Sequence, residues 1–266
     1  MGELSIVLMT VLATYDKNST NYIIASYIMN NVKALAKTQN LTTGYLAKQC
    51  NVSKASISRF CREVGFDDFY TFKYILKSFY PQYMTSKKYN FVKSPKTITT
   101  DFIDEFQASF KLFQESLRQQ DLDELCRDIR DFKNVVIMGH QQSFAMALTL
   151  QNDLGTAFNK FTMIVGEPSK QAETIEKSTE NDLFIVFSAT GGFFNHVLLK
   201  QKMSKFKGKL YLITVNEDAN FPFVTKKICL GKQYNYPTAI LMNLYIGLIS
   251  SNYYKLIESE NRTTNS

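Results

Sequence analysis

The sequence has few of the features that mark membrane-spanning or secreted proteins. No apolar run approaches the ~20 residues that a membrane-spanning helix needs. The richest stretch, AILMNLYIGLIS, is interrupted by Asn243 and is typical of a buried helix. The first residues include Glu3 and have no basic lead, so we expect no secretory signal. We therefore predict a cytoplasmic protein with no membrane partner.

Cysteine and histidine are scarce, and tryptophan is absent. The four cysteines, Cys50, Cys61, Cys126 and Cys229, show no paired spacing, and none has a nearby histidine partner. Because structural zinc sites need closely spaced Cys and His ligands, we expect no bound metal. We also expect no cofactor. The simplest interpretation of the four cysteines is buried thiols in a reducing compartment.

Charge is distributed unevenly along the 266 residues, although the overall composition, 45% hydrophobic and 21% charged, is that of a soluble globular protein. Residues 1–96 contain 13 basic and 5 acidic residues, a net charge of +8. Residues 97–266 contain 18 and 19, a net charge of −1. This asymmetry indicates a polyanionic partner for the front of the chain, although a solvated basic face is an equally simple explanation of charge alone.

Sequence patterns divide the chain into three parts. Residues 1–78 show apolar positions at helical spacing throughout, with no strand pattern. Residues 79–97 hold two of the five prolines, are rich in basic residues and show little periodicity, which is typical of a linker. Residues 98–266 begin with two amphipathic helices and end in a long helix near 237–257.

Between those helices, five apolar runs alternate with helical or polar segments. Continuous apolar strands separated by helices predict a parallel sheet that is covered on both faces. We therefore predict an all-α domain followed by a doubly wound, five-stranded α/β domain. The five strand segments are NVVIMG, KFTMIV, DLFIVFS, KLYLITV and KKICLG.

The segment LTTGYLAKQCNVSKASISRFCREV, residues 41–64, has the spacing of a helix-turn-helix motif. Asn51 falls where the turn needs a left-handed residue, a conformation that Asn tolerates better than most residues. Val52, Ile57 and Phe60 are placed to fill the space between the two helices. Ser53 can cap the second helix. This arrangement leaves the following residues facing outward: Lys54, Ala55, Ser56, Ser58 and Arg59.

Short polar and basic side chains suit a helix that enters the DNA major groove, because bulky ones would prevent close approach. Arg59 can form a bidentate contact with guanine, whereas Ser53 and Lys54 are better placed for phosphates. The alternative is a helical hairpin whose polar face is merely solvated. The spacing, the turn residue and the local charge together favour binding to double-stranded DNA.

The same segment resembles the N-terminal domain of the RpiR-type bacterial transcriptional regulators. The resemblance begins at ASYIMNN and extends through residue 78. It rests on the pairs and runs Leu46–Ala47, Val52–Ser53, Ser56–Ile57, Arg59–Phe60, Arg62, Val64–Gly65–Phe66 and Phe72–Lys73.

That resemblance implies a C-terminal sugar isomerase (SIS) domain, a parallel α/β fold that binds phosphorylated sugars. Such domains have a Gly-x-Gly-x-Ser loop after the first strand, where this chain has GHQQS, and a Ser-x-Ser-Gly-x-Thr loop after the third, where it has SATGGF. Gln141 and Phe193 depart from these patterns. The residues expected to bind the effector are Gly139, Ser143, Ser188, Thr190, Gly191 and Gly192.

We thus expect a transcriptional regulator of carbohydrate genes, with a repressor favoured, that binds an operator as a homodimer or homotetramer. A sugar phosphate or related carbohydrate would be its effector. We identify no catalytic residues, because no carboxylate near these loops is placed to form an acid–base pair. Two alternatives stay open: a phosphosugar isomerase with an accessory helical domain, and a regulator whose rear domain has lost ligand binding and only dimerises.

Overall fold

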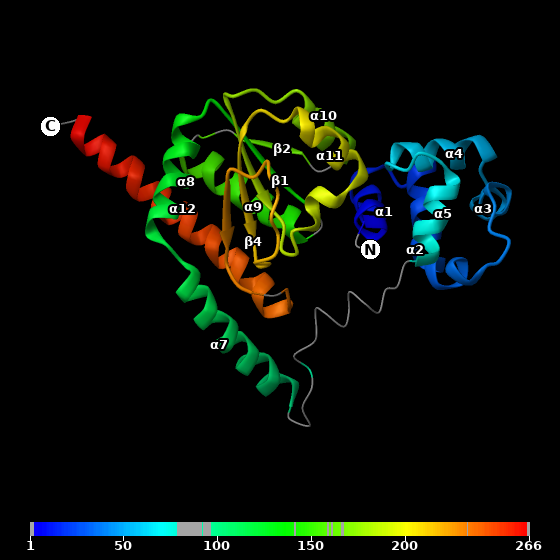
Figure 1. Ribbon diagram of the computed structural model, residues 1–266, viewed down its shortest axis with the longest axis horizontal. Coiled ribbons are helices and arrows are strands. Elements are labelled where there is room, and N and C mark those ends of the chain that lie inside the picture. The colour runs from blue at the N-terminus through cyan, green and yellow to red at the C-terminus, as the bar shows by residue number, and fades with distance from the viewer. Residues whose placement is uncertain are drawn as a thin grey trace. The chain divides into compact units, whose positions relative to one another are not determined.

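The computed structural model describes residues 3–78, 92, 97–140, 142–158, 160, 162–165, 168–232 and 234–264 (Figure 1). The chain divides into two compact units. One contains Met1–Met84, Gly166–Glu176 and Phe194–Ser204, and the other contains Thr85–Val165, Lys177–Phe193 and Lys205–Ser266. Almost all of the predicted linker, 79–97, lies outside the described residues, so the two boundaries of this linker stay a prediction.

The first unit contains the N-terminal helices that the apolar spacing predicts. Three of them begin with side-chain caps: the Ser19 hydroxyl accepts a hydrogen bond from the Tyr22 N–H (3.2 Å), the Thr42 hydroxyl from the Tyr45 N–H (3.1 Å), and the Ser53 hydroxyl from the Ser56 N–H (3.0 Å). The N-terminal helices are α1 (Glu3–Thr14), α2 (Thr20–Lys37), α3 (Thr43–Cys50), α4 (Lys54–Glu63) and α5 (Phe69–Ser78). The unit also includes α10 (Pro168–Glu176) and α11 (Val197–Lys202).

The core of these N-terminal helices is one apolar cluster to which each of them contributes. Phe72 of α5 lies at its centre and makes edge-to-face contacts with Phe60 and Phe66, at ring centroid distances of 6.4 and 5.5 Å. All three rings are buried. Leu76 is buried as well, and Phe69 and Ile75 pack against the cluster, so this apolar stripe is core and fixes α5 against α4; Phe79 lies outside the described residues.

The second unit contains a five-stranded sheet in the order β2-β1-β3-β4-β5, and every neighbouring pair is parallel. The chain order reverses between β1 and β3, which makes their carboxyl ends a topological switch point, where ligands bind in open α/β sheets. The predicted fold class is therefore confirmed. The strands are β1 (Asn134–Gly139), β2 (Met163–Val165), β3 (Asp182–Phe187), β4 (Lys209–Thr214) and β5 (Lys226–Cys229).

The second strand is shorter than the segment KFTMIV that the sequence predicts. Lys160 belongs to the end of the preceding helix, because its N–H donates to the Leu154 carbonyl (3.0 Å). Its ammonium group donates to the Arg130 and Phe132 carbonyls at 3.1 and 2.9 Å.

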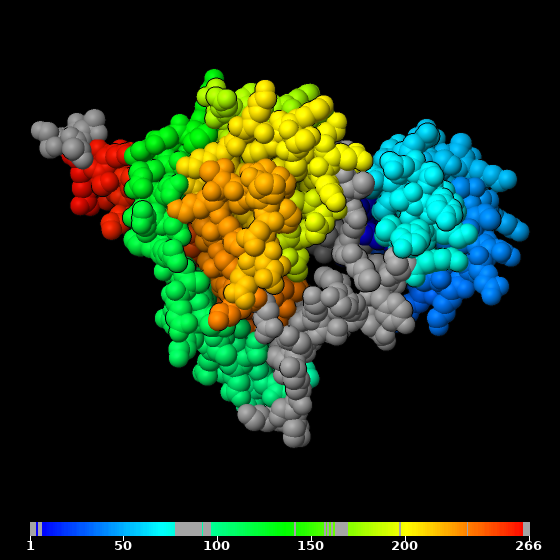
Figure 2. Space-filling model, viewed as in Figure 1, coloured from blue at the N-terminus to red at the C-terminus, as the bar shows by residue number. Residues whose placement is uncertain are grey.

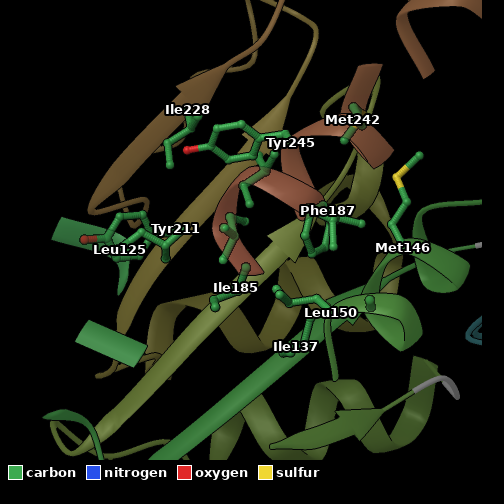
Figure 3. Packing of buried hydrophobic residues seen from close by; sticks show 14 of the residues in the cluster. Leu125, Ile137, Met146, Leu150, Ile185, Phe187, Tyr211, Ile228, Met242 and Tyr245 are labelled. Carbon is green, nitrogen blue, oxygen red and sulfur yellow. The ribbon is translucent and has the colours of Figure 1, made fainter. Parts of the chain in front are cut away.

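Four long helices pack with this sheet: α7 (Ile98–Ser116), α8 (Gln119–Asp131), α9 (Gln142–Phe158) and α12 (Tyr236–Thr264). Figure 3 shows Ile137 and Ile185 of the strands together with Leu150 of α9 and Tyr245 of α12. The alternate strand residues Val136, Met138, Phe184, Val186, Leu210 and Leu212 are buried as well. Burial at consecutive positions explains why the strands are continuous apolar runs rather than alternating ones.

A network of charged groups joins α8 to the amino ends of β4 and β5. Lys209 lies 2.6 Å from Asp128, Lys226 lies 2.8 Å from Asp121, and Glu124 contacts both lysines. The buried Tyr211 hydroxyl donates to Asp128 (2.5 Å) and Glu124 (3.1 Å). Hydrogen bonding to Lys226 outweighs burial and holds the pKa of Glu124 at about 2.

Replacing Glu124 with glutamine is expected to destabilise the chain by about 1 kcal/mol at pH 7, since partial exposure screens the ion pairs. Because the folded-state pKa of Glu124 is lowered, its contribution is fully present above the unfolded value near 4.5 and is lost as the pH falls toward 2. Urea unfolding of both proteins from pH 7 to pH 2 measures this. The difference in unfolding free energy should disappear at the acidic end, and a difference that grows there would contradict the assignment. Glu258→Gln, at a surface pair with Arg262, is the control and should change little.

None of the helices in the described ranges is long and apolar enough to cross a membrane.

Candidate functional sites

The turn between α3 and α4 has the backbone conformation that the sequence predicts. Asn51 has φ 53° and ψ 46°, which makes it the one non-glycine residue with positive φ in the described part of the chain. The following N–H, of Val52, donates to the Ala47 carbonyl (2.9 Å) and so closes the end of α3. The predicted left-handed turn is confirmed.

Packing then sets the angle at which α4 leaves the turn. Leu46 and Ala47 of α3 are buried, as are Ile57 and Phe60 of α4. Ser53 caps α4 by accepting a hydrogen bond from the Ser56 N–H at 3.0 Å. Because one side of α4 is fixed in this way, its opposite side is left for solvent or a partner.

The predicted recognition residues differ in their exposure to solvent. Ser53, Lys54, Ala55 and Arg59 are exposed. Ser56 and Ser58 are half-buried, and their hydroxyls are engaged: Ser56 with Ser53 (2.9 Å), and Ser58 with the Lys54 carbonyl (3.3 Å). The exposed basic groups are therefore better placed to contact DNA than these two serines.

Sequence reasoning missed two features of this surface. The Lys54 side chain lies over Gly44, where a Cβ would stand only 3.1 Å from Cε, so the absence of a side chain at Gly44 leaves room for Lys54 beside the first turn of α3. On α5, Tyr70 and Tyr74 are 76% and 68% exposed. Figure 2 shows the α5 segment, in cyan, at the surface. The spacing of four residues places both tyrosines on one face.

The excess of basic residues in 1–96 is divided between two segments. Residues 1–78 contain nine Lys and Arg against five Asp and Glu, a net charge of +4. The other four basic residues, Lys87, Lys88, Lys93 and Lys96, belong to the predicted linker and lie outside the described residues.

In the second unit, the carboxyl ends of β1 and β3 bring the predicted effector residues to neighbouring strands. Gly139 ends β1 and pairs with Phe187, which directly precedes Ser188. A Cβ at Gly139 would lie 2.5 Å from the Ser143 carbonyl oxygen, so the turn into α9 requires glycine. Ser143 is buried, and Gln141 lies outside the described residues.

Three backbone donors of the loop after β3 form hydrogen bonds within the loop. The Gly191 N–H donates to the Ser188 carbonyl (3.0 Å), the Gly192 N–H to the Thr190 hydroxyl (3.3 Å), and the Phe193 N–H to the Ser188 hydroxyl (3.1 Å). The short helix Gly192–Asn195 follows. Ser188 is buried, whereas Thr190 is exposed.

Contacts from the loop after β4 fix this conformation further. The Asn216 side-chain amide donates to the Thr190 carbonyl (2.9 Å), and the Thr214 hydroxyl donates to the Ala189 carbonyl (3.2 Å). Gly191 has φ 76°, and a Cβ there would lie 2.4 Å from the Ala219 Cβ. Thr214 is fully buried, and its hydroxyl also accepts from the Asn216 N–H (3.2 Å).

An aromatic stack joins the two loops at the switch point. The rings of His140 and Phe193 lie 4.4 Å apart at an interplanar angle of 29°. Both residues are buried. The sequence identified Phe193 only as a departure from the family pattern, and nothing in the pattern predicted that it stacks on the residue after Gly139.

A cavity of about 260 Å³ lies elsewhere in this unit, between the last turns of α7 and the ends of β4 and β5. Its lining contains none of the predicted effector residues. The cavity is lined by Leu112, Glu115, Ser116, Glu217, Cys229, Gly231 and Lys232.

The cysteines are free, and three of the four are buried, as the sequence predicts. Burial raises the pKa of Cys50 and of Cys126 to about 11, and that of Cys61 to about 12. These thiols therefore stay protonated and unreactive at neutral pH. Cys229 is only half-buried.

The two units combine a helix-turn-helix with a doubly wound α/β fold. Residues 15–82 match the model of the helix-turn-helix domain of the rpiR family, so the front of the chain is a domain of that family.

Two curated relatives are uncharacterized HTH-type transcriptional regulators. The one from Clostridium perfringens is 28% identical over 66% of this chain and 64% of its own length. The one from Thermotoga maritima is 27% identical over 62% and 59%. The chain therefore matches less than two thirds of the length of either relative.

One solved structure of similar fold is that of the Vibrio vulnificus NanR protein complexed with ManNAc-6P. The match covers 98% of this chain and 94% of the NanR chain. Its TM-score is 0.50 at 15% identity, a similarity of fold.

Proposed function

We propose that this protein is a DNA-binding transcriptional regulator of carbohydrate genes, most simply a repressor, controlled by a carbohydrate-derived effector such as a sugar phosphate. The observation that carries the proposal is the α3–α4 geometry: a left-handed Asn51, a capped α4 and an exposed face with Lys54 and Arg59. The rpiR-family match of the same residues supports it.

The effector is proposed to bind at the carboxyl ends of β1 and β3, in contact with Gly139, Ser143, Ser188, Thr190, Gly191 and Gly192. The location of these residues supports the proposal, because the ends of β1 and β3 form the topological switch point of the sheet. The solved structure of similar fold contains ManNAc-6P, which makes a sugar phosphate a reasonable first ligand to test.

We propose that this domain regulates rather than catalyses. Sugar-phosphate isomerisation needs an acid–base pair positioned beside the substrate. Within the described residues of the two loops, His140 is the one ionisable side chain, and it is buried in the stack with Phe193. The curated relatives are also regulators by name.

A homodimer or homotetramer is the proposed assembly. Leu148 of α9 and Leu244 of α12 are each 44% exposed, on two helices that pack together. A second copy of the chain would cover such apolar side chains, and a two-fold symmetric operator would then have half-sites separated by whole helical turns.

Replacing Ser188 with alanine is expected to weaken the effector's influence on operator binding about tenfold, because one hydroxyl contact and one loop bond are lost. The measurement is the effector concentration that half-maximally changes operator affinity, with ManNAc-6P and other sugar phosphates as first ligands. Ser178→Ala is a matched control. The buried Ser178 hydroxyl accepts a hydrogen bond from the Lys207 N–H at 3.0 Å, close to the 3.1 Å between the Phe193 N–H and the Ser188 hydroxyl. If both variants respond like the wild type, Ser188 is not part of the site.

A further inference from the structure

We propose that Phe193 is a specificity-determining residue of the effector site, where its ring keeps the loop after β3 closed against phosphoryl groups. The inference rests on the proposed function in that it concerns the same site. It adds that this chain binds the carbohydrate part of an effector with little help from a phosphate.

Several backbone N–H groups that could bind a phosphate already have hydrogen-bond partners in the protein. A phosphate at the carboxyl end of a strand is held mainly by backbone N–H groups that point outward at a turn or helix start. Here the N–H groups of Gly191, Gly192 and Phe193 all donate within the loop, at 3.0 to 3.3 Å. On the neighbouring strand end, the Ser143 N–H donates to the His140 carbonyl (3.0 Å). A phosphoryl group would have to replace these bonds before it gained its own.

The position of the Phe193 ring also opposes opening of the loop. Phe193 is 2% exposed and stacks on His140 at 4.4 Å, so its side chain lies against the residue that follows β1. The bond from the Phe193 N–H to the Ser188 hydroxyl links the backbone that carries the ring to one of the predicted effector residues. Opening the loop therefore requires the stack and the hydroxyl bond to break together.

Residues after β4 hold the rest of the loop in place. Asn216 holds the Thr190 carbonyl, and the Ala219 side chain fills the space beside Gly191. The loop therefore cannot turn its amides outward by a local change at the glycines alone. Phe193 is the bulky, apolar member of the loop, so replacing its side chain is the smallest change that opens space beside the loop.

The test compares binding of glucose 6-phosphate, glucose and inorganic phosphate to three full-length proteins by titration calorimetry: wild type, Phe193→Thr and Phe193→Leu. The threonine variant removes the ring and supplies a hydroxyl. It is expected to bind glucose 6-phosphate at least about tenfold more tightly than the wild type, with glucose changed less than about twofold. The leucine variant removes the ring with little loss of volume and should show a smaller rise, about threefold, for the phosphate ester only.

The ratio of the affinities for the ester and the free sugar is the decisive number, because a merely structural role of Phe193 would leave that ratio unchanged. An unchanged ratio in both variants overturns the inference, and so does a wild-type protein that already prefers the ester tenfold. If Phe193→Thr does not fold, the ratio for Phe193→Leu decides alone. Operator binding by the ligand-free wild type is measured in parallel. If the wild type does not bind the operator, the proposed role as a regulator is contradicted. The ratio of ester to sugar affinity can still be interpreted in that case.

Discussion

Replacing Arg59 with alanine is expected to weaken operator binding by ~1–3 kcal/mol and to relax the preference at one base pair. Arg59 is exposed on α4 and makes no hydrogen bond or ion pair with other described residues, so its guanidinium group is available to a base edge. Loss of a bidentate contact with guanine removes discrimination as well as affinity. The measurement is the affinity for the operator and for single-base variants of it.

Lys54→Ala provides the matched comparison on the same helix. Lys54 lies beside the first turn of α3 and over Gly44, a position suited to a phosphate rather than to a base. Its loss should weaken binding to all sequences alike and reduce the slope of log affinity against log salt by about 1. Equal effects of both substitutions on operator and random duplex would contradict the separate roles.

Replacing Gly139 with alanine is expected to destabilise the chain by about 3 kcal/mol or more. The new Cβ would lie 2.5 Å from the Ser143 carbonyl oxygen and 2.9 Å from the Phe144 nitrogen, both backbone atoms at the start of α9. Backbone cannot move aside as a flexible side chain does, so the strand or the helix must shift within a packed core. Chemical denaturation followed by circular dichroism measures the loss.

Gly155→Ala is the control for this substitution. Gly155 lies in the same helix, α9, and a Cβ there meets no atom within 4 Å. Since alanine is the better helix former, this variant should be stabilised by about 0.5–1 kcal/mol. A Gly139→Ala protein as stable as the wild type would show that the β1–α9 turn is looser than its geometry implies.

The features that the sequence predicted correctly are those that depend on near neighbours. Asn51 adopts the left-handed conformation because two helices meet at that residue, and Ser53 caps the helix that begins directly after it. The strands follow from runs of consecutive apolar residues, which only a sheet covered on both faces explains. Local chemistry decides each of these features, so one sequence suffices to predict them.

The conformation of the loop after β3, at the proposed effector site, depends on tertiary contacts and could not be predicted in this way. The position of Phe193 relative to Ser188 was visible in the sequence, but its stacking on His140 required the pairing of β1 with β3. The ion network of α8 is similar, because amphipathic spacing predicts the helix but not its partners Lys209 and Lys226 on two later strands.

Selective capture of genomic fragments by the purified full-length protein shows whether α4 reads DNA sequence. Fragments are recovered over a series of salt concentrations, with and without sugar phosphates, and sequenced beside a random duplex pool. The account predicts enrichment of a few fragments that share a two-fold symmetric sequence, and loss of that enrichment in Arg59→Ala. Recovery that follows the random pool under every condition would contradict it.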